Sequence, residues 1–131
     1  MKLEYVGTDI EELSVKKELP EDAEISLQAN SRFTIYFSDD GDSCIGEFGV
    51  TIFSQFNPEQ LTINYSSKSF FNMYDAPSGP ESEEEIHDEL YNRIFPMCNE
   101  TIKQFTSMVG LPNISLVEMD MASIGKTQGL N

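Results

Sequence analysis

Hydrophobic and polar residues alternate along the first half of the chain, and this period of two predicts β-strands. Three runs carry the alternation, at residues 24–37, 44–56 and 61–71. Residues 38–42 (Ser-Asp-Asp-Gly-Asp) and 57–60 (Asn-Pro-Glu-Gln) separate these runs and are typical of tight turns. Three long strands joined by short turns predict an antiparallel meander with one buried face and one largely polar face.

The segment before these runs predicts a fourth, less regular strand. Leu3 and Tyr5 begin it with the same parity, and Val15 continues it near the other end. Residues 7–12 interrupt the alternation, so we expect the strand to be broken there and to close before Pro20.

After a breaker-rich crossover at residues 75–81 the hydrophobic period changes to 3.6, which predicts one long helix over residues 82–110. Ser82 and Glu85 form a capping box at its start, and Pro96 predicts a kink or a restart within it. The apolar stripe that would lie on the sheet consists of Leu90, Ile94, Cys98, Ile102, Phe105 and Val109.

The length of 131 residues is that of one domain with a single core. We therefore expect one α+β domain over residues 1–131, with the sheet at 1–74 and the helix at 82–110. The crossover at 75–81 joins them, and residues 111–131 form an extended tail that frays from residue 124 onward.

The net charge of the chain restricts the kinds of partner that it can bind. Twenty-three acidic residues against eight basic ones give a net charge of −15. Such a surface repels phosphate backbones, and no basic stripe offsets it, so nucleic acid is not expected as a partner. The charge favours basic partners through electrostatic steering; the alternative, that it only maintains solubility, stays open.

The expected compartment is the cytoplasm. The first residues lack the basic head and the unbroken apolar stretch of a secretion signal. Nowhere do about 18 apolar residues follow one another, so no membrane insertion is expected. The two cysteines, Cys44 and Cys98, are expected to be buried thiols rather than a disulfide.

Motifs that would carry chemistry are incomplete. The run Gly125-Lys126-Thr127 ends like a phosphate loop, but Asp120 stands where the first glycine is required. The turn at residues 38–42 imitates part of a calcium loop without its first ligands and is interpreted as a hairpin. His87 is expected on a solvated, acidic helix start, where no nucleophile accompanies it. We therefore expect no catalytic residue, no metal, no cofactor and no enzymatic activity.

Several large apolar side chains remain after the buried stripes are assigned, because their parity or helical phase is wrong for the core. Contiguous residues of this kind mark interfaces, and methionine and aromatic side chains suit adaptable ones. They are either buried against an oligomer partner or form a peptide groove, and the two uses are compatible. The candidate peptide- or interface-binding residues are Tyr36, Phe53, Phe70, Tyr74, Met97 and Met108.

Three stretches of the sequence resemble the SecB-like superfamily, the relatives of the bacterial protein-export chaperone, and most closely a Gram-positive family within it. Gly7-Thr8-Asp9-Ile10, with Leu13 and Ser14, is similar to the broken first strand of that superfamily. Ile94-Phe95-Pro96 followed by Glu100 is similar to its helix opening. Gly110-Leu111-Pro112 is similar to the loop after that helix, and the likeness continues through Ile114, Leu116 and Met119 to Met121.

This resemblance implies a four-stranded antiparallel Greek-key sheet with a long helix packed on it, assembled as dimers or tetramers. It also implies the capture of unfolded chains along apolar grooves. The sequence departs from the chaperones after Pro96, and residues 123–131 are too short and glycine-rich for their second C-terminal helix. We expect a non-catalytic, chaperone-like module that binds extended or basic polypeptide segments; the alternative is a structural subunit of a homo- or hetero-oligomer without clients.

Overall fold

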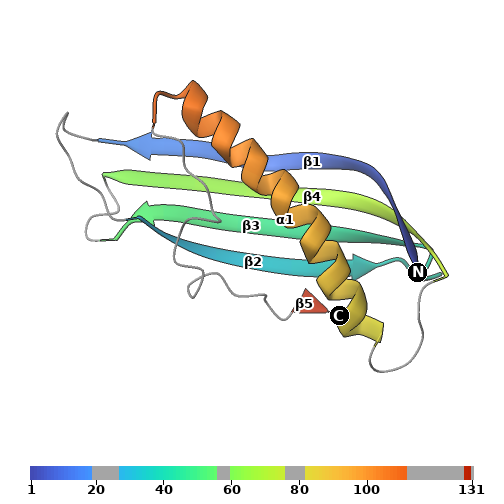
Figure 1. Ribbon diagram of the computed structural model, residues 1–131. Coiled ribbons are helices and arrows are strands. Elements are labelled where there is room, and N and C mark those ends of the chain that lie inside the picture. Colours follow the sequence, from blue (N-terminus) through green and yellow to red (C-terminus); the bar gives the residue numbers. More distant parts are fainter. Residues whose placement is uncertain (19–26, 56–59, 76–81, 112–128, 131) are drawn as a thin grey trace.

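Four long strands form an antiparallel sheet, and one helix crosses a single face of it diagonally (Figure 1). The computed structural model describes residues 1–18, 27–55, 60–75, 82–111 and 129–130. The elements are β1 (Lys2–Lys17), β2 (Leu27–Phe37), β3 (Ser43–Ser54), β4 (Leu61–Tyr74), α1 (Ser82–Met108) and β5 (Gly129–Leu130).

The order of the strands in the sheet is β1-β4-β3-β2-β5. Strands β2, β3 and β4 are consecutive neighbours, as the alternation predicts, and β1 returns to pair with β4, which makes a Greek key. The α+β fold expected from the sequence is therefore confirmed. Strand β5 pairs with β2 in parallel at Thr34 and Ile35, where a frayed end was expected. The rest of the tail, from residue 112 to 128, lies outside the described residues.

The turn between β2 and β3 is a tight hairpin stabilised by its own side chains. The Ser38 hydroxyl donates to Asp40 Oδ1 at 2.6 Å, and the Asp42 amide donates to the same oxygen at 3.0 Å. These hydrogen bonds lower the pKa of the Asp40 carboxyl, the one from Ser38 most. Gly41 has a φ of 76°, which glycine adopts without strain. The Asp40 carboxylate thus caps the turn that was interpreted as a hairpin.

Strand β1 corrects the expectation of a strand broken over residues 7–12. It pairs with β4 along its whole length, from Lys2 opposite Tyr74 to Lys17 opposite Leu61. The alternation fails because the register shifts twice, between Tyr5 and Gly7 and between Ile10 and Glu12. Each shift places an extra residue in β1 and changes the parity of the residues after it, as β-bulges do.

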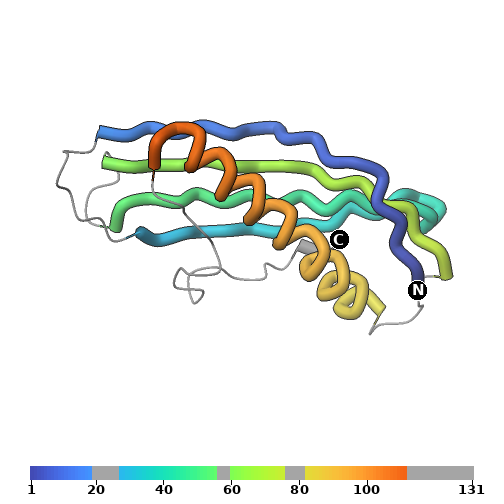
Figure 2. Tube along the Cα trace, turned by 45° about the horizontal axis from the view of Figure 1, so that its top comes forward, coloured from blue at the N-terminus to red at the C-terminus, as the bar shows by residue number. Residues whose placement is uncertain are grey.

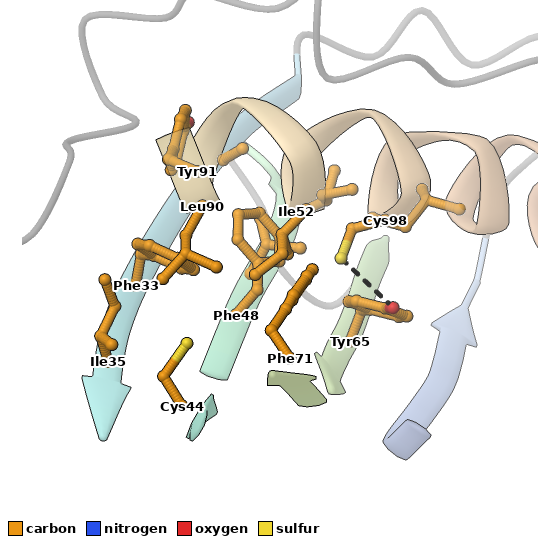
Figure 3. Close-up of a cluster of buried hydrophobic side chains, with 14 of the residues drawn as sticks. Phe33, Ile35, Cys44, Phe48, Ile52, Tyr65, Phe71, Leu90, Tyr91 and Cys98 are labelled. Carbon is orange, nitrogen blue, oxygen red and sulfur yellow. Dashed lines mark hydrogen bonds between the residues drawn. The ribbon is translucent and has the colours of Figure 1, made fainter. Parts of the chain in front are cut away.

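The core lies between the helix and one face of the sheet, to which each strand contributes every second residue (Figure 3). Its largest fully buried side chains are Phe33, Phe48 and Phe71, one from each central strand. Aromatic rings of the helix continue the cluster, since Tyr91 packs edge-on against Phe33 with ring centres 5.5 Å apart. Strand β3 offers Gly46 under the helix, where a Cβ atom would overlap the Cδ1 of Ile94. The helix therefore approaches the sheet most closely where the side chain is missing.

Helix α1 is continuous through Pro96, so the restart that was one of two expectations does not occur. Proline removes the hydrogen bond to the carbonyl four residues earlier, here that of Asn92. Both Asn92 and Pro96 lie on the exposed side of the helix, where solvent can satisfy that carbonyl. At the other end of the helix, Lys17 Nζ donates to the carbonyl of Val109 at 2.6 Å, so β1 caps the helix that crosses it.

Candidate functional site

Six large hydrophobic side chains among the described residues are exposed, and they are unevenly distributed. Three of them lie in the first ten residues of β1, at the edge of the sheet. Two more lie on the face of the sheet opposite the helix, and the sixth is Met108, which is 84% exposed at the end of the helix. The sheet therefore offers two candidate surfaces, which we call the β1 edge and the open face.

The β1 edge is formed by Tyr5, Val6 and Ile10, which are 47%, 61% and 50% exposed. Tyr5 and Ile10 stand opposite the buried residues Phe71 and Ser67, so they point to the helix side of the sheet. The helix, however, crosses diagonally toward the far end of β1 and leaves the middle of the strand uncovered (Figures 1 and 2). Tyr5 and Ile10 therefore lie on the core side of the sheet but remain exposed to solvent.

Tyr5 is exposed but held in place. Its ring packs edge-on against Phe71 with centres 5.5 Å apart, and its hydroxyl lies 2.6 Å from Thr8 Oγ1. Thr8 Oγ1 lies in turn 3.0 Å from the hydroxyl of Ser69. A fixed aromatic ring loses little conformational entropy when a partner covers it, which favours binding.

The β1 edge is also acidic. Between residues 4 and 13 the strand carries Glu4, Asp9, Glu11 and Glu12 and no lysine or arginine. Because β1 is the terminal strand of the sheet, one side of its backbone does not pair with a neighbouring strand among the described residues. Such an edge can accept a further strand through main-chain hydrogen bonds.

The open face carries an apolar row that runs across three strands. Tyr36 of β2 stands opposite Ile45 of β3, which stands opposite Phe70 of β4. Tyr36 is 43% exposed, and the other two are half-buried. We call these three residues the apolar row. Cross-strand neighbours are about 5 Å apart, so they form one continuous strip.

Farther along the same strands the open face is hollow. The row that contains Arg32, Gly49, Ser66 and Glu12 lies four residues from the apolar row on each central strand. Here a concavity of about 340 Å³ opens, and we call it the polar hollow. Its lining includes Asn30, Arg32, Gly49, Thr51, Asn64 and Ser66. The missing side chain of Gly49 forms its floor, and the Arg32 side chain lies across that floor.

The six predicted binding residues do not form one groove. Tyr36 and Phe70 share the apolar row, but Phe53 lies eight residues along β3 from Ile45, or roughly 26 Å. The remaining three also lie apart: Tyr74 ends β4 with its hydroxyl 3.4 Å from Glu4, Met97 packs half-buried against the core, and Met108 extends into solvent.

Ile45 and the three residues of the β1 edge were not among the residues predicted from the sequence. Ile45 has the parity of Phe53, opposite to Phe48 and Val50, and this signal was available. Tyr5 and Ile10 have the parity of the core, and their exposure follows from the direction of the helix, which no local pattern shows.

His87 corrects another expectation. It is only 7% exposed, and its ring lies edge-on to Phe33 with centres 5.2 Å apart, so it belongs to the core and not to a solvated helix start. Its position three and seven residues before Leu90 and Ile94 places it on the buried stripe. Among the residues that the structure describes, no group of three His, Cys, Asp or Glu side chains is arranged to hold a metal ion.

The two thiols are buried in different parts of the core and are both free. The Tyr65 hydroxyl donates to Cys98 Sγ at 3.4 Å (Figure 3). The Ser67 hydroxyl lies 3.6 Å from the same sulfur. Burial raises the pKa of the Cys98 thiol, and it raises the pKa of Cys44 to about 11. Both thiols are thus held in the protonated, unreactive form near neutral pH.

No helix among the described residues combines the length and the apolarity needed to cross a membrane.

The Greek-key sheet with one long helix on a single face defines a SecB-like fold. The solved structure of the SecB-like chaperone Rv1957 of Mycobacterium tuberculosis, in complex with a ChAD peptide from the HigA1 antitoxin, shares this fold with a TM-score of 0.65. The match covers 87% of this chain and 85% of that chain at 11% sequence identity. No protein-family model and no curated protein sequence matches this chain.

Proposed function

We propose that this protein is a non-catalytic, chaperone-like module that captures extended polypeptide segments, with a preference for basic ones. The observation that carries the proposal is the β1 edge: Tyr5, Val6 and Ile10 are exposed on the terminal strand of the sheet, which carries four carboxylates between residues 4 and 12. The SecB-like fold adds support, since the solved chaperone of this fold holds a peptide of another protein.

The mechanism follows from strand geometry. An extended segment would pair with the free backbone edge of β1, and alternate side chains of that segment would cover Tyr5 and Ile10. Lysine or arginine residues of the segment would meet Glu4 and Asp9, and the net charge of −15 would speed their approach. Main-chain pairing does not depend on sequence, so apolar and basic composition would set the preference.

The same edge also fits a second copy of the chain, because a long bare edge strand is usually covered in solution. We therefore propose a homo-oligomer, a dimer or a tetramer, as the setting of this function. If self-association consumes the whole edge, the protein is instead a structural subunit of a homo- or hetero-oligomer that binds no clients. A cytoplasmic location is part of the proposal, in keeping with the two free thiols.

The test replaces an exposed apolar residue of the β1 edge by lysine. Val6→Lys places a positive charge among the carboxylates, which should weaken binding of a labelled basic peptide by about tenfold or more. Met108→Lys is the matched control, because it makes the same kind of change at an exposed residue on the helix. Fluorescence anisotropy gives the affinity, and light scattering gives the mass of each variant.

Three outcomes separate the interpretations. Loss of peptide binding in Val6→Lys alone supports capture at the β1 edge. A smaller mass in Val6→Lys with unchanged peptide binding would show that β1 is a subunit interface and that clients bind elsewhere. If the wild-type protein binds no basic peptide and leaves the aggregation of an equimolar unfolding client unchanged, the chaperone-like function is wrong.

A further inference from the structure

The open face differs in charge from the molecule as a whole. On it, Lys2, Lys16, Arg32 and Lys68 stand among Glu4, Asp9, Glu12 and Glu47, as the register of the strands shows, and Glu11 of the β1 bulge pairs with Lys68. Half of the eight basic residues of the chain therefore lie on this one face. At physiological salt, where distant charges are screened, the local groups of this face decide what it can bind.

Arg32 is the cation that lies over the polar hollow. A Cβ atom on Gly49 would lie 3.2 Å from Arg32 Nε and 3.6 Å from its Cζ, so the Arg32 side chain passes over Gly49 of β3. No carboxylate among the described residues forms an ion pair with Arg32. By contrast, Lys68 of the neighbouring row pairs with Glu11 at 3.6 Å. Arg32 thus has hydrogen-bonding capacity left for a ligand.

The groups around the hollow suit a carboxylate held at Arg32. Planar guanidinium binds carboxylate through two parallel hydrogen bonds. The Thr51 hydroxyl donates to Asn64 Oδ1 at 3.0 Å, which leaves the amide nitrogen of Asn64 as a further donor at the hollow. Glu12 lines the other end, on β1, three strands away from Arg32. The hollow is polarised, with its positive end on β2.

The distance between the hollow and the apolar row matches an extended chain. Four residues separate Arg32 from Tyr36, Gly49 from Ile45, and Ser66 from Phe70. Four strand residues span about 13 Å, and side chains four positions apart in an extended peptide point to the same side. The row between the two sites contains Glu47, Lys68 and Asp9, and Lys68 also pairs with Glu11. This row is therefore net negative and leaves Arg32 as the group that can hold a carboxylate.

We propose that the open face is a second recognition surface, which binds an extended polypeptide segment through a carboxylate at Arg32 and a large apolar side chain at the apolar row, four residues apart. The carboxylate is that of an Asp or Glu side chain or of a chain terminus. This surface differs from the β1 edge, whose apolar residues Tyr5 and Ile10 point to the helix side of the sheet, and its ligand is of opposite charge. The proposal therefore goes beyond the function proposed above.

The experiment measures anisotropy of labelled decapeptides of serine and threonine with one phenylalanine and one glutamate four positions away. The peptides have blocked ends, and the buffer holds about 0.15 M salt, where the Debye length of about 8 Å screens the overall charge of the protein. We expect the glutamate peptide to bind about tenfold more tightly than its glutamine counterpart, as a charge-assisted hydrogen bond allows. A third peptide, with a free terminal carboxylate in place of glutamate, identifies the source; tight binding of either acid supports the proposal.

Variants of the full chain locate the site. Arg32→Gln should remove the discrimination between glutamate and glutamine, whereas Lys16→Gln, the same charge change on the same face, should keep it. Gly49→Ala should reduce the discrimination, because the new Cβ displaces the guanidinium. Ile45→Ser should weaken both peptides alike, and thermal unfolding checks that each variant folds.

Equal binding of the glutamate and glutamine peptides to the wild type would overturn the proposal, as would equal losses in Arg32→Gln and Lys16→Gln. Neither result affects capture of basic peptides at the β1 edge, which the Val6→Lys comparison tests separately. Conversely, a failure of that comparison with retained discrimination at Arg32 would leave only the open-face site.

Discussion

The two faces of the sheet are built from the same four strands, yet they differ in almost every physical respect. The face under the helix carries Phe33, Phe48 and Ile63, which are fully buried. The open face carries Tyr36 and Ile45, which are exposed or half-buried, beside charged residues of both signs. Because side chains of a strand alternate between faces, one sequence encodes both surfaces without conflict.

Because of this difference, we expect residues of one face to determine stability and residues of the other to determine binding. The helix-covered face buries the apolar area that holds the fold, so its residues should respond to mutation with losses of stability. The open face contributes little burial, so its residues can change with little effect on folding and a large effect on a partner. The β1 edge lies between the two cases, because Tyr5 and Ile10 have core parity but lack the cover of the helix.

The largest expected effect comes from two isoleucines of the same strand on opposite faces. Ile52 is fully buried under the helix, and Ile52→Ala should lower the free energy of unfolding by about 3 kcal/mol. Ile45→Ala on the open face should cost about 1 kcal/mol or less, because Ile45 is only half-buried. Urea unfolding measures both. Equal losses would show that the open face is buried in the assembled protein.

The next largest effect is the dependence of stability on pH, because the buried face under the helix disfavours the charged form of its ionisable side chains. In the unfolded chain a cysteine thiol has a pKa near 9, whereas burial in the folded protein raises the pKa of Cys44 to about 11. Deprotonation therefore favours the unfolded chain, and stability that is complete below pH 9 is lost as the pH rises toward 11. A shift of this size corresponds to at most about 3 kcal/mol.

Cys44→Ala provides the control for this alkaline loss. The variant should start about 1 kcal/mol less stable at neutral pH, for the lost packing, and its stability should fall less steeply above pH 9. Cys98, Tyr65 and Tyr91 also have a pKa raised mainly by burial, so part of the slope remains. An unchanged slope in Cys44→Ala would show that this thiol does not contribute.

The sequence predicted the covered face better than the edges. The alternation in β2, β3 and β4 identified Phe33, Phe48 and Ile63 as core residues, because burial on one face imposes a strict period of two. It failed in β1, where two bulges change the parity and the pattern looks like a break. The expectation for His87 was wrong because the acidic residues around it suggested a solvated helix start, although His87 lies on the buried stripe of the helix.

The candidate surfaces were less predictable for a different reason. Parity alone placed Tyr36, Phe53 and Phe70 off the core, and the structure agrees. Which of them are neighbours depends on the register between strands, which brings Tyr36 and Phe70 together through Ile45 and leaves Phe53 apart. Register and the direction of the helix are long-range properties, so neither the apolar row nor the β1 edge follows from a local pattern.

A pair of glycines on the same strand sharpens the comparison between the faces. Gly46→Ala places a Cβ against Ile94 under the helix, and we expect a loss of about 1 to 3 kcal/mol from overpacking. The nearest atoms to the new Cβ of Gly49→Ala, on the open face, all belong to the exposed Arg32 side chain, which can move away into solvent. Its stability should change by less than about 0.5 kcal/mol. Thermal unfolding measures both, and a similar loss for Gly49→Ala would show that Arg32 is fixed by a contact beyond this chain.

The smallest effect is expected from the ion pair of the open face. Lys68 Nζ and a Glu11 carboxylate oxygen are 3.6 Å apart, and both side chains are over a third exposed. Solvent-exposed pairs of this kind contribute about 0.5 kcal/mol or less, so the double-mutant cycle of Glu11→Gln and Lys68→Gln should yield a coupling free energy near that value. A coupling above about 1 kcal/mol would mean that water is excluded from the pair. Since nothing in this chain covers Lys68 on the open face among the described residues, such a value would place a partner on that face even without a ligand, and the polar hollow would then be part of a permanent interface.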